Sequence, residues 1–237
     1  MVGKMRAIQF QAKRVGSTFL QKAIDSHPEI MGIDEVFVNM ANKQGMKKSG
    51  FTPFLRSDYN NPKDYIEKVI NRKYTNEHTI FKLMYNQIEW HPGLLDYILD
   101  EKIPMIHVMR LNLVKQIISG LNAAIEDHVP IKITGQRLLK AVTEARKLQI
   151  YWADKFKDQI KLTLIYEDLI GEVYGERTFL SKLANVAVCD VFNVPQCRLF
   201  AETKKKNRED LSVYLPNIDD IKQVFEGTGF EWMLEGE

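Results

Sequence analysis

A short turn near the amino end of the chain carries the residue types that hold a phosphate or sulfate group. It reads RVGSTFL (residues 14–20) and lies between an apolar run and a helical pattern. Gly16 lets the backbone approach an anion closely, and amides at a helix start point outward where the helix dipole favours negative charge. Ser17 and Thr18 add hydroxyl donors, and Arg14 adds a cation. The alternative is that Ser17 only caps the helix and Arg14 is solvated.

A second candidate anion site lies in the segment IHVMRLNLVKQIISGLNAA (residues 106–124). Arg110 ends a densely apolar run, and Ser119 follows on the next helical pattern. A charged residue at the end of a buried strand costs desolvation energy unless it meets an anion. An ordinary salt bridge at the strand end, with Ser119 as a small packing residue, is the alternative.

The elements that must position these residues alternate along the chain. The sequence predicts strands at Met5–Phe10, Glu29–Ile33, Thr79–Tyr85, Met105–Arg110 and Ile160–Leu169. It predicts helices at Ser17–Ser26, Asp64–Lys73, His91–Glu101, Leu113–Asp127 and Gln136–Lys157. The remainder reads as mostly helical. This alternation predicts one α/β domain, residues 1–237, with a central parallel sheet covered on both faces. Ligands then sit beyond the carboxyl ends of the strands, where Arg14 and Arg110 meet.

Composition limits the class of protein. The 33 basic and 31 acidic residues leave a formal net charge of +2, so no global field would gather nucleic acid. Cys189 and Cys197 have no CxxC pair or Cys/His cluster around them, which argues against a zinc site. We expect free thiols, with a bridge as the alternative. No apolar run suits a signal peptide or a membrane span, so we expect a cytoplasmic enzyme; a catalytic domain cut from a membrane-anchored parent would look the same.

Taken together, these segments resemble the sulfotransferases that use 3′-phosphoadenosine 5′-phosphosulfate (PAPS), most nearly the bacterial carbohydrate-type members. That family carries an [RK]-x-G-[ST]-[ST] loop after its first strand for the 5′-phosphosulfate, and Val15 stands here where a small polar residue is usual. The resemblance implies a P-loop-like nucleotide-binding fold, release of 3′,5′-bisphosphoadenosine (PAP) and no metal. It assigns the nucleotide contacts of the loop to Arg14, Val15, Gly16, Ser17, Thr18 and Phe19.

The resemblance extends to the other phosphate and the base. An Arg and a Ser hold the 3′-phosphate in that family, and Arg110 and Ser119 match by position, with a spacing one residue longer than usual. Tyr166, in IYEDL, matches a tyrosine near the adenine, although packing in a buried strand is the alternative. A basic loop near the C-terminus offers further 3′-phosphate ligands, or else a solvated face. Its candidates are Lys204, Lys205 and Lys206.

At the position of the catalytic base, this chain differs from the phenol and steroid sulfotransferases. In those members the base is a His in a K-x-H segment of the third strand. FKLMYNQ keeps Lys82 but has Met84 where that His would be. In bacterial carbohydrate sulfotransferases a Glu just after the second strand is proposed as the base, and Glu35 occupies that position. Asp34 is the weaker candidate, and a helix-start carboxylate is the structural alternative. The resemblance thus implies Arg14, Lys82 and Glu35 as catalytic residues.

The histidines have other expected roles. His27 matches the family's S-H-P segment as a structural residue, and His107 lies inside an apolar strand as a core residue. His91 is expected to cap a helix or lie at the surface. No motif surrounds His78 or His128.

Two rival functions remain at this level. A kinase with a divergent phosphate loop would need a Mg²⁺-binding Asp at a strand end, and Asp168 is the candidate. Against it, the kinase-type pattern GxxxxGK[ST] is missing, because no GK pair precedes Ser17. The other rival is a non-catalytic nucleotide-binding domain.

The acceptor is open. The resemblance favours a hydroxyl or amine of a carbohydrate, a lipid-linked sugar or a small metabolite. Residues 41–61 and 126–136 are expected to shape the acceptor pocket. Phe225, Phe230 and Trp232 either pack internally or form a homodimer contact.

Overall fold

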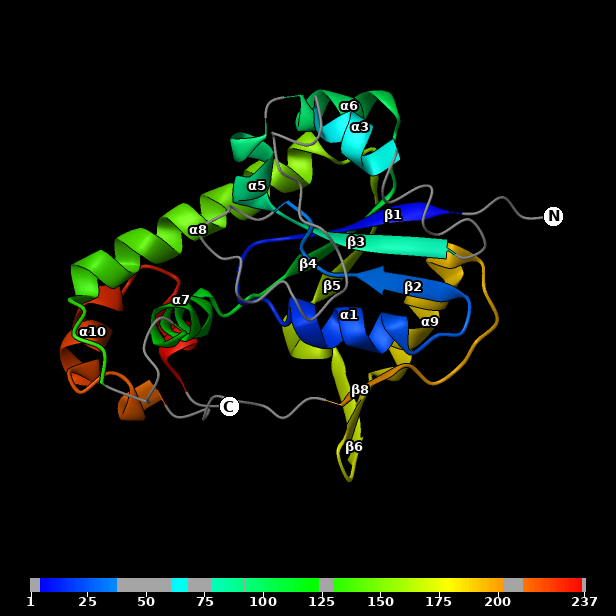
Figure 1. The fold of residues 1–237 in the computed structure, drawn as a ribbon. Coiled ribbons are helices and arrows are strands. Elements are labelled where there is room, and N and C mark those ends of the chain that lie inside the picture. Colours follow the sequence, from blue (N-terminus) through cyan, green and yellow to red (C-terminus); the bar gives the residue numbers. More distant parts are fainter. Residues whose placement is uncertain are drawn as a thin grey trace.

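Five parallel strands form the central sheet of the computed structural model, in the order β2-β3-β1-β4-β5 (Figure 1). The structure describes residues 5–37, 61–67, 78–91, 93–123, 130–202 and 211–235. The strands of the central sheet are β1 (Arg6–Gln11), β2 (Ile30–Ile33), β3 (His78–Met84), β4 (Met105–Met109) and β5 (Ile160–Ile165). The predicted α/β class with a central parallel sheet is confirmed.

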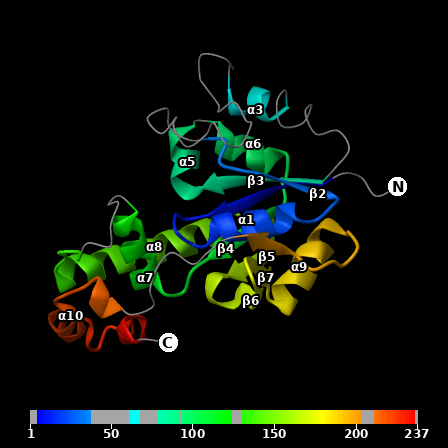
Figure 2. The same cartoon turned by 60° about the horizontal axis from the view of Figure 1, so that its bottom comes forward.

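Helices cover both faces of this sheet, as Figures 1 and 2 show from two directions. One face is covered by α1 (Ser17–Asp25) and α9 (Lys182–Phe192). The other face is covered by α5 (Tyr85–Trp90), α6 (Leu94–Asp100) and the end of α8 (Gly135–Lys155). Successive side chains of β1 point to opposite faces of the sheet, so this strand contributes to both layers. Ala7 packs in the layer of α1, whereas Ile8 and Phe10 pack in the opposite layer.

A third apolar cluster lies around the amino half of α8. It joins that helix to α7 (Leu113–Asn122), α10 (Ile218–Phe225) and the 3₁₀ helix η5 (Glu231–Leu234). Phe225 is fully buried here and Phe230 packs against the cluster, so these two aromatic rings pack internally. Trp232 remains 46% exposed.

Several predicted boundaries shift where strands end. β3 ends at Met84, and Tyr85, predicted as the last strand residue, already begins α5. The helix predicted from His91 to Glu101 is present as α6, which begins at Leu94. β5 ends at Ile165, so the YED segment is not strand but the 3₁₀ helix η3 (Tyr166–Asp168). In this 3₁₀ helix the Tyr166 ring lies against Gly16, and the Glu167 carboxylate accepts from the amides that follow β4.

The prediction of a mostly helical remainder is wrong. The strands β6 (Ile170–Tyr174), β7 (Arg177–Leu180) and β8 (Phe200–Glu202) form a separate antiparallel sheet. Gly175 lies in the two-residue turn between β6 and β7 with φ 58°, a backbone that glycine adopts without strain. This Gly-Glu turn between β-branched and aromatic residues is the signal of a hairpin that the helical interpretation overlooked.

The helix predicted from Asp64 begins slightly earlier, as α3 (Pro62–Tyr65). Asn61 caps it by accepting a hydrogen bond of 2.9 Å from the Asp64 amide. The continuation of that helix beyond residue 67, and residues 41–60 of the predicted acceptor loop, lie outside the described residues.

Candidate active site

The turn between β1 and α1 has the left-handed backbone that an anion cradle needs. Arg14 and Gly16 have φ angles of 64° and 75°. Gly16 adopts this freely, whereas Arg14 stores backbone strain of a kind that concentrates at functional sites. Two buried side chains hold the turn: Gln9 Nε2 donates to the Ser17 carbonyl at 2.9 Å, and Gln116 Nε2 donates to the Lys13 carbonyl at 2.8 Å.

The predicted loop contacts divide into backbone and side-chain groups. The side chains of Val15 and Phe19 lie in the core, so these two residues can offer a ligand only their amides. No side chain caps the start of α1, and Gly16 precedes it. The first-turn amides, together with the partly or fully exposed Ser17 and Thr18, therefore form a set of donors at a helix start.

Arg14 bridges the loop and α7. Its Nε donates to Ser119 Oγ at 3.1 Å. A Cβ on Gly120 would come within 3.8 Å of the Arg14 Cγ, so the side chain lies along this helix. Arg14 of the loop therefore contacts Ser119 of α7, although 105 positions separate the two residues.

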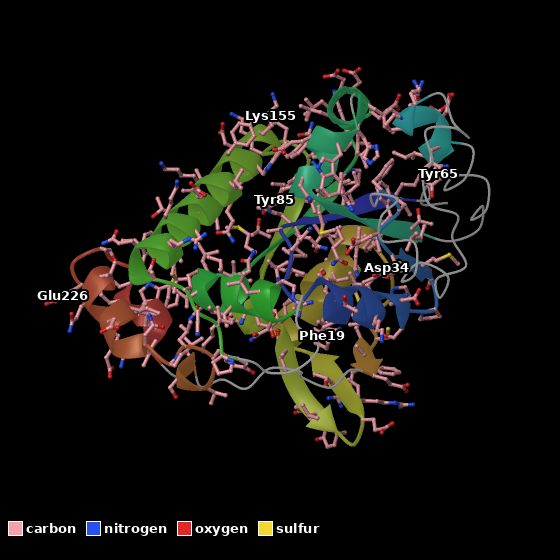
Figure 3. All side chains as sticks on the ribbon, turned by 60° about the vertical axis from the view of Figure 1, so that its left-hand side comes forward. Phe19, Asp34, Tyr65, Tyr85, Lys155 and Glu226 are labelled. Atoms are coloured by element: carbon pink, nitrogen blue, oxygen red, sulfur yellow. The ribbon has the colours of Figure 1, made fainter. Side chains whose placement is uncertain are left out.

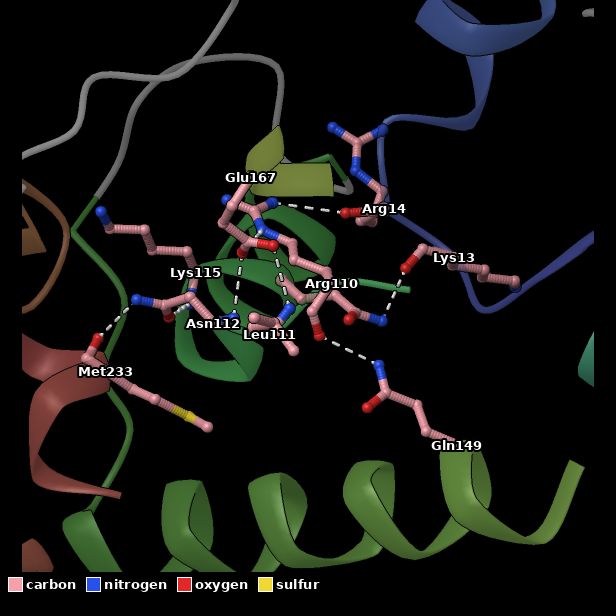
Figure 4. Close-up of polar contacts among 10 residues, drawn as sticks. Lys13, Arg14, Arg110, Leu111, Asn112, Lys115, Gln149, Glu167 and Met233 are labelled. Atoms are coloured by element: carbon pink, nitrogen blue, oxygen red, sulfur yellow. Dashed lines mark hydrogen bonds and ion pairs between the residues drawn. The ribbon is translucent and has the colours of Figure 1, made fainter. Parts of the chain in front are cut away.

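Arg110 lies just beyond β4, and three different groups surround its guanidinium; Figure 4 shows two of them, the Arg14 carbonyl and Glu167. Its Nη1 donates to the Arg14 carbonyl at 3.3 Å, and its Nε lies 3.8 Å from Glu167 Oε1. The guanidinium carbon lies 4.5 Å from the centre of the Tyr166 ring, a cation–π contact. The two predicted anion-binding segments therefore share one edge of the sheet.

Tyr166 packs directly on the glycine of the loop. A Cβ placed on Gly16 would overlap the Tyr166 ring. The residue belongs to η3 and is only partly buried, so it is not the fully buried strand residue of the alternative interpretation. Its ring joins the β1–α1 turn to Arg110, in a place where a flat base could stack.

Lys82 connects the loop to the second strand's end. The side chain is 2% exposed, and its Nζ donates to Asp34 Oδ1 at 2.8 Å and to Thr18 Oγ1 at 3.4 Å. Figure 3 places Asp34 after β2, beside α1. A buried ammonium is costly without a partner, and the partner here is Asp34, whereas the sequence singled out its neighbour Glu35.

The two carboxyl groups after β2 differ in their electrostatics. Burial raises the pKa of Glu35 above its usual 4.5 and the Asp34 charge adds to this, while Lys82 and Lys13 oppose it. Burial would also raise the pKa of Asp34, but the charge and hydrogen bond of Lys82 and the Glu35 amide outweigh it and lower that pKa. A base with a raised pKa is the stronger proton acceptor, so this difference favours Glu35 over Asp34.

Two of the described histidines, His27 and His107, hold structural positions. His27 Nδ1 accepts from the Glu29 amide at 3.0 Å, and its Nε2 lies 2.9 Å from the Pro195 carbonyl. His107 is fully buried and lies 2.6 Å from the Tyr85 hydroxyl. Burial lowers the pKa of His107 to about 4. Both fit the structural roles expected for them.

Some predicted residues lie elsewhere. Lys204, Lys205 and Lys206 fall outside the described residues. Asp168, the candidate metal ligand of the kinase alternative, is exposed in η3. Across the described ranges, no group of three or more His, Cys, Asp or Glu side chains lies together as a metal site, and no helix is both long and apolar enough to cross a membrane.

Sequence reasoning missed the polar residues that support the site. Gln9 and Gln11 alternate with Ile8 and Phe10, so they occupy the α1 face of β1 beneath the loop. Their period-two spacing within an apolar strand was the available signal. Glu167 and Asn112 were missed as well, because their contacts run between segments far apart in the chain.

The donor set fits a doubly phosphorylated nucleotide. Arg14, Arg110 and Ser119 supply charge and hydrogen-bond donors on one edge, and the first-turn amides of α1 supply more. Gln11 is fully buried, and its Nε2 has no hydrogen-bond partner within the described part of the chain. A buried donor without a partner is costly, so the position of Gln11 beneath the loop suits a ligand that accepts hydrogen bonds.

Comparison with known proteins supports the same architecture. No family model and no curated protein matches the chain. Among solved structures, a sulfotransferase from Alicyclobacillus acidocaldarius aligns over 94% of this chain and 96% of its own, with a TM-score of 0.51 and 13% identity. The sulfotransferase domain of the Synechococcus PCC 7002 olefin synthase aligns over 81% of this chain and 74% of its own, with a TM-score of 0.46 and 16% identity. The chain therefore has the sulfotransferase fold: a parallel five-stranded sheet between helices, with a glycine turn after its first strand.

Proposed function

We propose that this chain is a sulfotransferase that moves a sulfuryl group from PAPS to a hydroxyl or amine of a carbohydrate or small-metabolite acceptor. The observation that carries the proposal is the meeting of Arg14, Ser119 and Arg110 at one edge of the sheet. Two anion-binding segments almost a hundred positions apart fit a ligand with phosphate at two ends. The fold shared with a sulfotransferase supports the same conclusion.

The nucleotide-binding roles proposed here combine this geometry with the family resemblance. The amides of the first turn of α1, with Ser17 and Thr18, hold the 5′ end, where negative charge builds as the sulfuryl group leaves. Arg110 and Ser119 hold the 3′-phosphate, and Tyr166 offers its ring to the adenine. Arg14 binds the sulfate and the leaving 5′-phosphate, and its hydrogen bond to Ser119 brings it next to the residues proposed for the 3′-phosphate. Lys204, Lys205 and Lys206 are proposed as further 3′-phosphate ligands.

The chemistry that PAPS supplies is an activated sulfuryl group, which is transferred in line without a need for metal. Glu35 accepts the acceptor's proton, because burial has raised its pKa. Lys82 places a positive charge next to Thr18, at the start of α1, where it stabilises the charge that forms on the leaving phosphate. Its pairing with Asp34 keeps that ammonium fixed in a buried position.

Calorimetry tests the nucleotide assignment. PAP should bind without magnesium, and ATP with magnesium should bind far more weakly. An acceptor screen with ³⁵S-labelled PAPS then tests the transfer, with carbohydrates and small hydroxyl or amine metabolites as acceptors. A chain that binds ATP with magnesium but not PAP would be a kinase instead. PAP binding without transfer to any acceptor would indicate a binding domain.

A further inference from the structure

Glu167 has contacts that no nucleotide-binding role assigns to it. Its two carboxylate oxygens accept hydrogen bonds from consecutive backbone amides after β4: Oε2 from Leu111 and Oε1 from Asn112, both at 3.0 Å (Figure 4). The side chain is 21% exposed. Hydrogen bonds to an ionised carboxylate are shorter and stronger than neutral ones. Glu167 therefore fixes the backbone of the turn that carries Arg110.

The same carboxylate also orients the Arg110 side chain. Its Oε1 lies 3.8 Å from the Arg110 Nε, and the arginine side chain is 13% exposed. The neighbouring Tyr166 lies under the guanidinium at 4.5 Å, and the Arg14 carbonyl accepts from Nη1 at 3.3 Å. Glu167 thus lies at ion-pair distance from the Nε edge of the guanidinium, while the Tyr166 ring contacts its face and the Arg14 carbonyl accepts from its Nη1 end.

Other elements fix the turn without touching the guanidinium. Gln149 of α8 donates to the Arg110 carbonyl at 3.0 Å. Asn112 Oδ1 accepts from the Lys115 amide at 2.9 Å, and its Nδ2 donates to the Met233 carbonyl at 3.1 Å. These bonds set the backbone position. Among these supports, Glu167 is the one that acts on both the backbone of the turn and the charged group.

We infer that Glu167 is a positioning residue that preorganises Arg110 and so makes the site prefer nucleotides with a 3′-phosphate. This inference rests on the proposed function. An arginine side chain has several rotatable bonds, and holding it in place before binding removes an entropic cost that binding would otherwise carry. The benefit applies to the group that Arg110 meets and not to the rest of the nucleotide.

A competing effect has the opposite sign. Glu167 is itself negative, so it repels a phosphate bound to Arg110. If repulsion dominated, removal of the charge would strengthen binding of the 3′-phosphate. A Gln side chain at this position can accept a hydrogen bond from one of the two backbone amides through its oxygen. Its NH₂ group would then lie against the other backbone N–H, and two donors cannot form a hydrogen bond. We therefore expect loss of the turn's geometry to outweigh the loss of repulsion.

The test compares PAP with 5′-AMP, which differs only in lacking the 3′-phosphate, by calorimetry. Glu167→Gln should weaken PAP about 10-fold or more and 5′-AMP less than about 3-fold, so the preference for PAP falls. Glu172→Gln is the matched control, because Glu172 is exposed on β6 and its ion pair with Arg198 lies at the surface. It should leave both affinities unchanged.

A double-mutant cycle separates positioning from general damage. In an Arg110→Ala background, Glu167→Gln should cause no further loss of PAP affinity, because the residue that it positions is gone. Glu167→Asp serves if the Gln variant does not fold; it keeps the charge but cannot span both amides, and should lower the preference in part. An unchanged or increased PAP preference in both variants overturns the inference. If the unsubstituted chain does not bind PAP, it is the proposed function that fails.

Discussion

The two ends of the candidate site are built differently. At the Arg110 end, side chains from η3 and α8 and the backbone of the β1–α1 turn all contact one short segment. At the Glu35 end, one ion pair between a buried Lys82 and a 53% exposed Asp34 carries most of the charge. The first end is held by geometry, whereas the second depends on a balance of charges around a half-buried carboxyl group.

This difference matches two demands of the proposed sulfuryl transfer. Binding a fixed anion benefits from donors that do not move, since preorganisation lowers the entropic cost. A general base instead needs a pKa that its surroundings can raise. Substitutions at the Arg110 end should therefore change nucleotide affinity, and those at the Glu35 end should change turnover and its pH dependence.

The largest effect is expected for Glu35→Gln. Loss of a general base lowers turnover about 10²–10⁴-fold, while PAP affinity should stay within about 2-fold because the Arg110 end is intact. Initial rates with labelled PAPS and calorimetry with PAP measure the two quantities. Glu89→Gln, an exposed carboxylate on α5, is the control. Full turnover in the Glu35 variant would remove this residue from its role and would erase the contrast between the two ends.

Arg110→Ala should have the reverse pattern. Truncation of a positioned, largely buried cation weakens PAP about 10²–10³-fold, and binding of 5′-AMP should change little. Arg137→Ala, on the exposed start of α8, is the control for loss of one positive charge. An equal loss for both nucleotides would mean that Arg110 holds the fold and not the 3′-phosphate.

Local patterns foretold the sheet and the loop. The apolar run of β4 and the Gly-Ser-Thr segment at the start of α1 are contiguous signals, and the structure has a strand and a glycine turn followed by a helix at these places. The β6–β7 hairpin was mistaken for helix because its strands are short and exposed, so burial imposes no clear period on them. Hydrophobic periodicity is a weak signal in strands such as these, because no buried face requires apolar residues at alternate positions.

The sequence could predict site residues only where the residue type and its local position already indicate a function. The sequence singled out Arg14 beside a glycine turn and Arg110 at a strand end, with Ser119 on the next helix, and the structure brings the three together. Glu167 was hidden, since its function lies in contacts with amides 55 and 56 positions away. Likewise, no sequence pattern tells which of two adjacent carboxylates, Asp34 or Glu35, meets the Lys82 ammonium. That choice depends on side-chain directions at the end of β2.

A third prediction concerns His107, which is buried in β4 only three positions before Arg110 and therefore lies close to the Arg110 end of the site but inside the core. Its folded pKa of about 4 lies below the ordinary 6.5, so the unfolded chain takes up the proton first. Its contribution to stability is present above pH 6.5 and is lost, by about 3 kcal/mol, as the pH falls toward 4. Urea unfolding at several pH values should show this slope, and His107→Gln should remove it without changing turnover. A loss of turnover in this variant would mean that the buried His107 takes part in the reaction together with the residues of the Glu35 end.

The smallest expected effect belongs to Asp34→Asn. It leaves the buried Lys82 with a weaker partner, which should cost about 1–3 kcal/mol in unfolding free energy. The change also removes the negative charge that helps to raise the Glu35 pKa and leaves the Lys82 charge less neutralised, and both lower that pKa. A base with a lower pKa is deprotonated at lower pH, so the acidic limb of the kcat/KM profile should move to lower pH. A limb that moves to higher pH, or that stays in place, would mean that Glu35 is not the titrating base, because removal of the neighbouring negative charge must lower the Glu35 pKa.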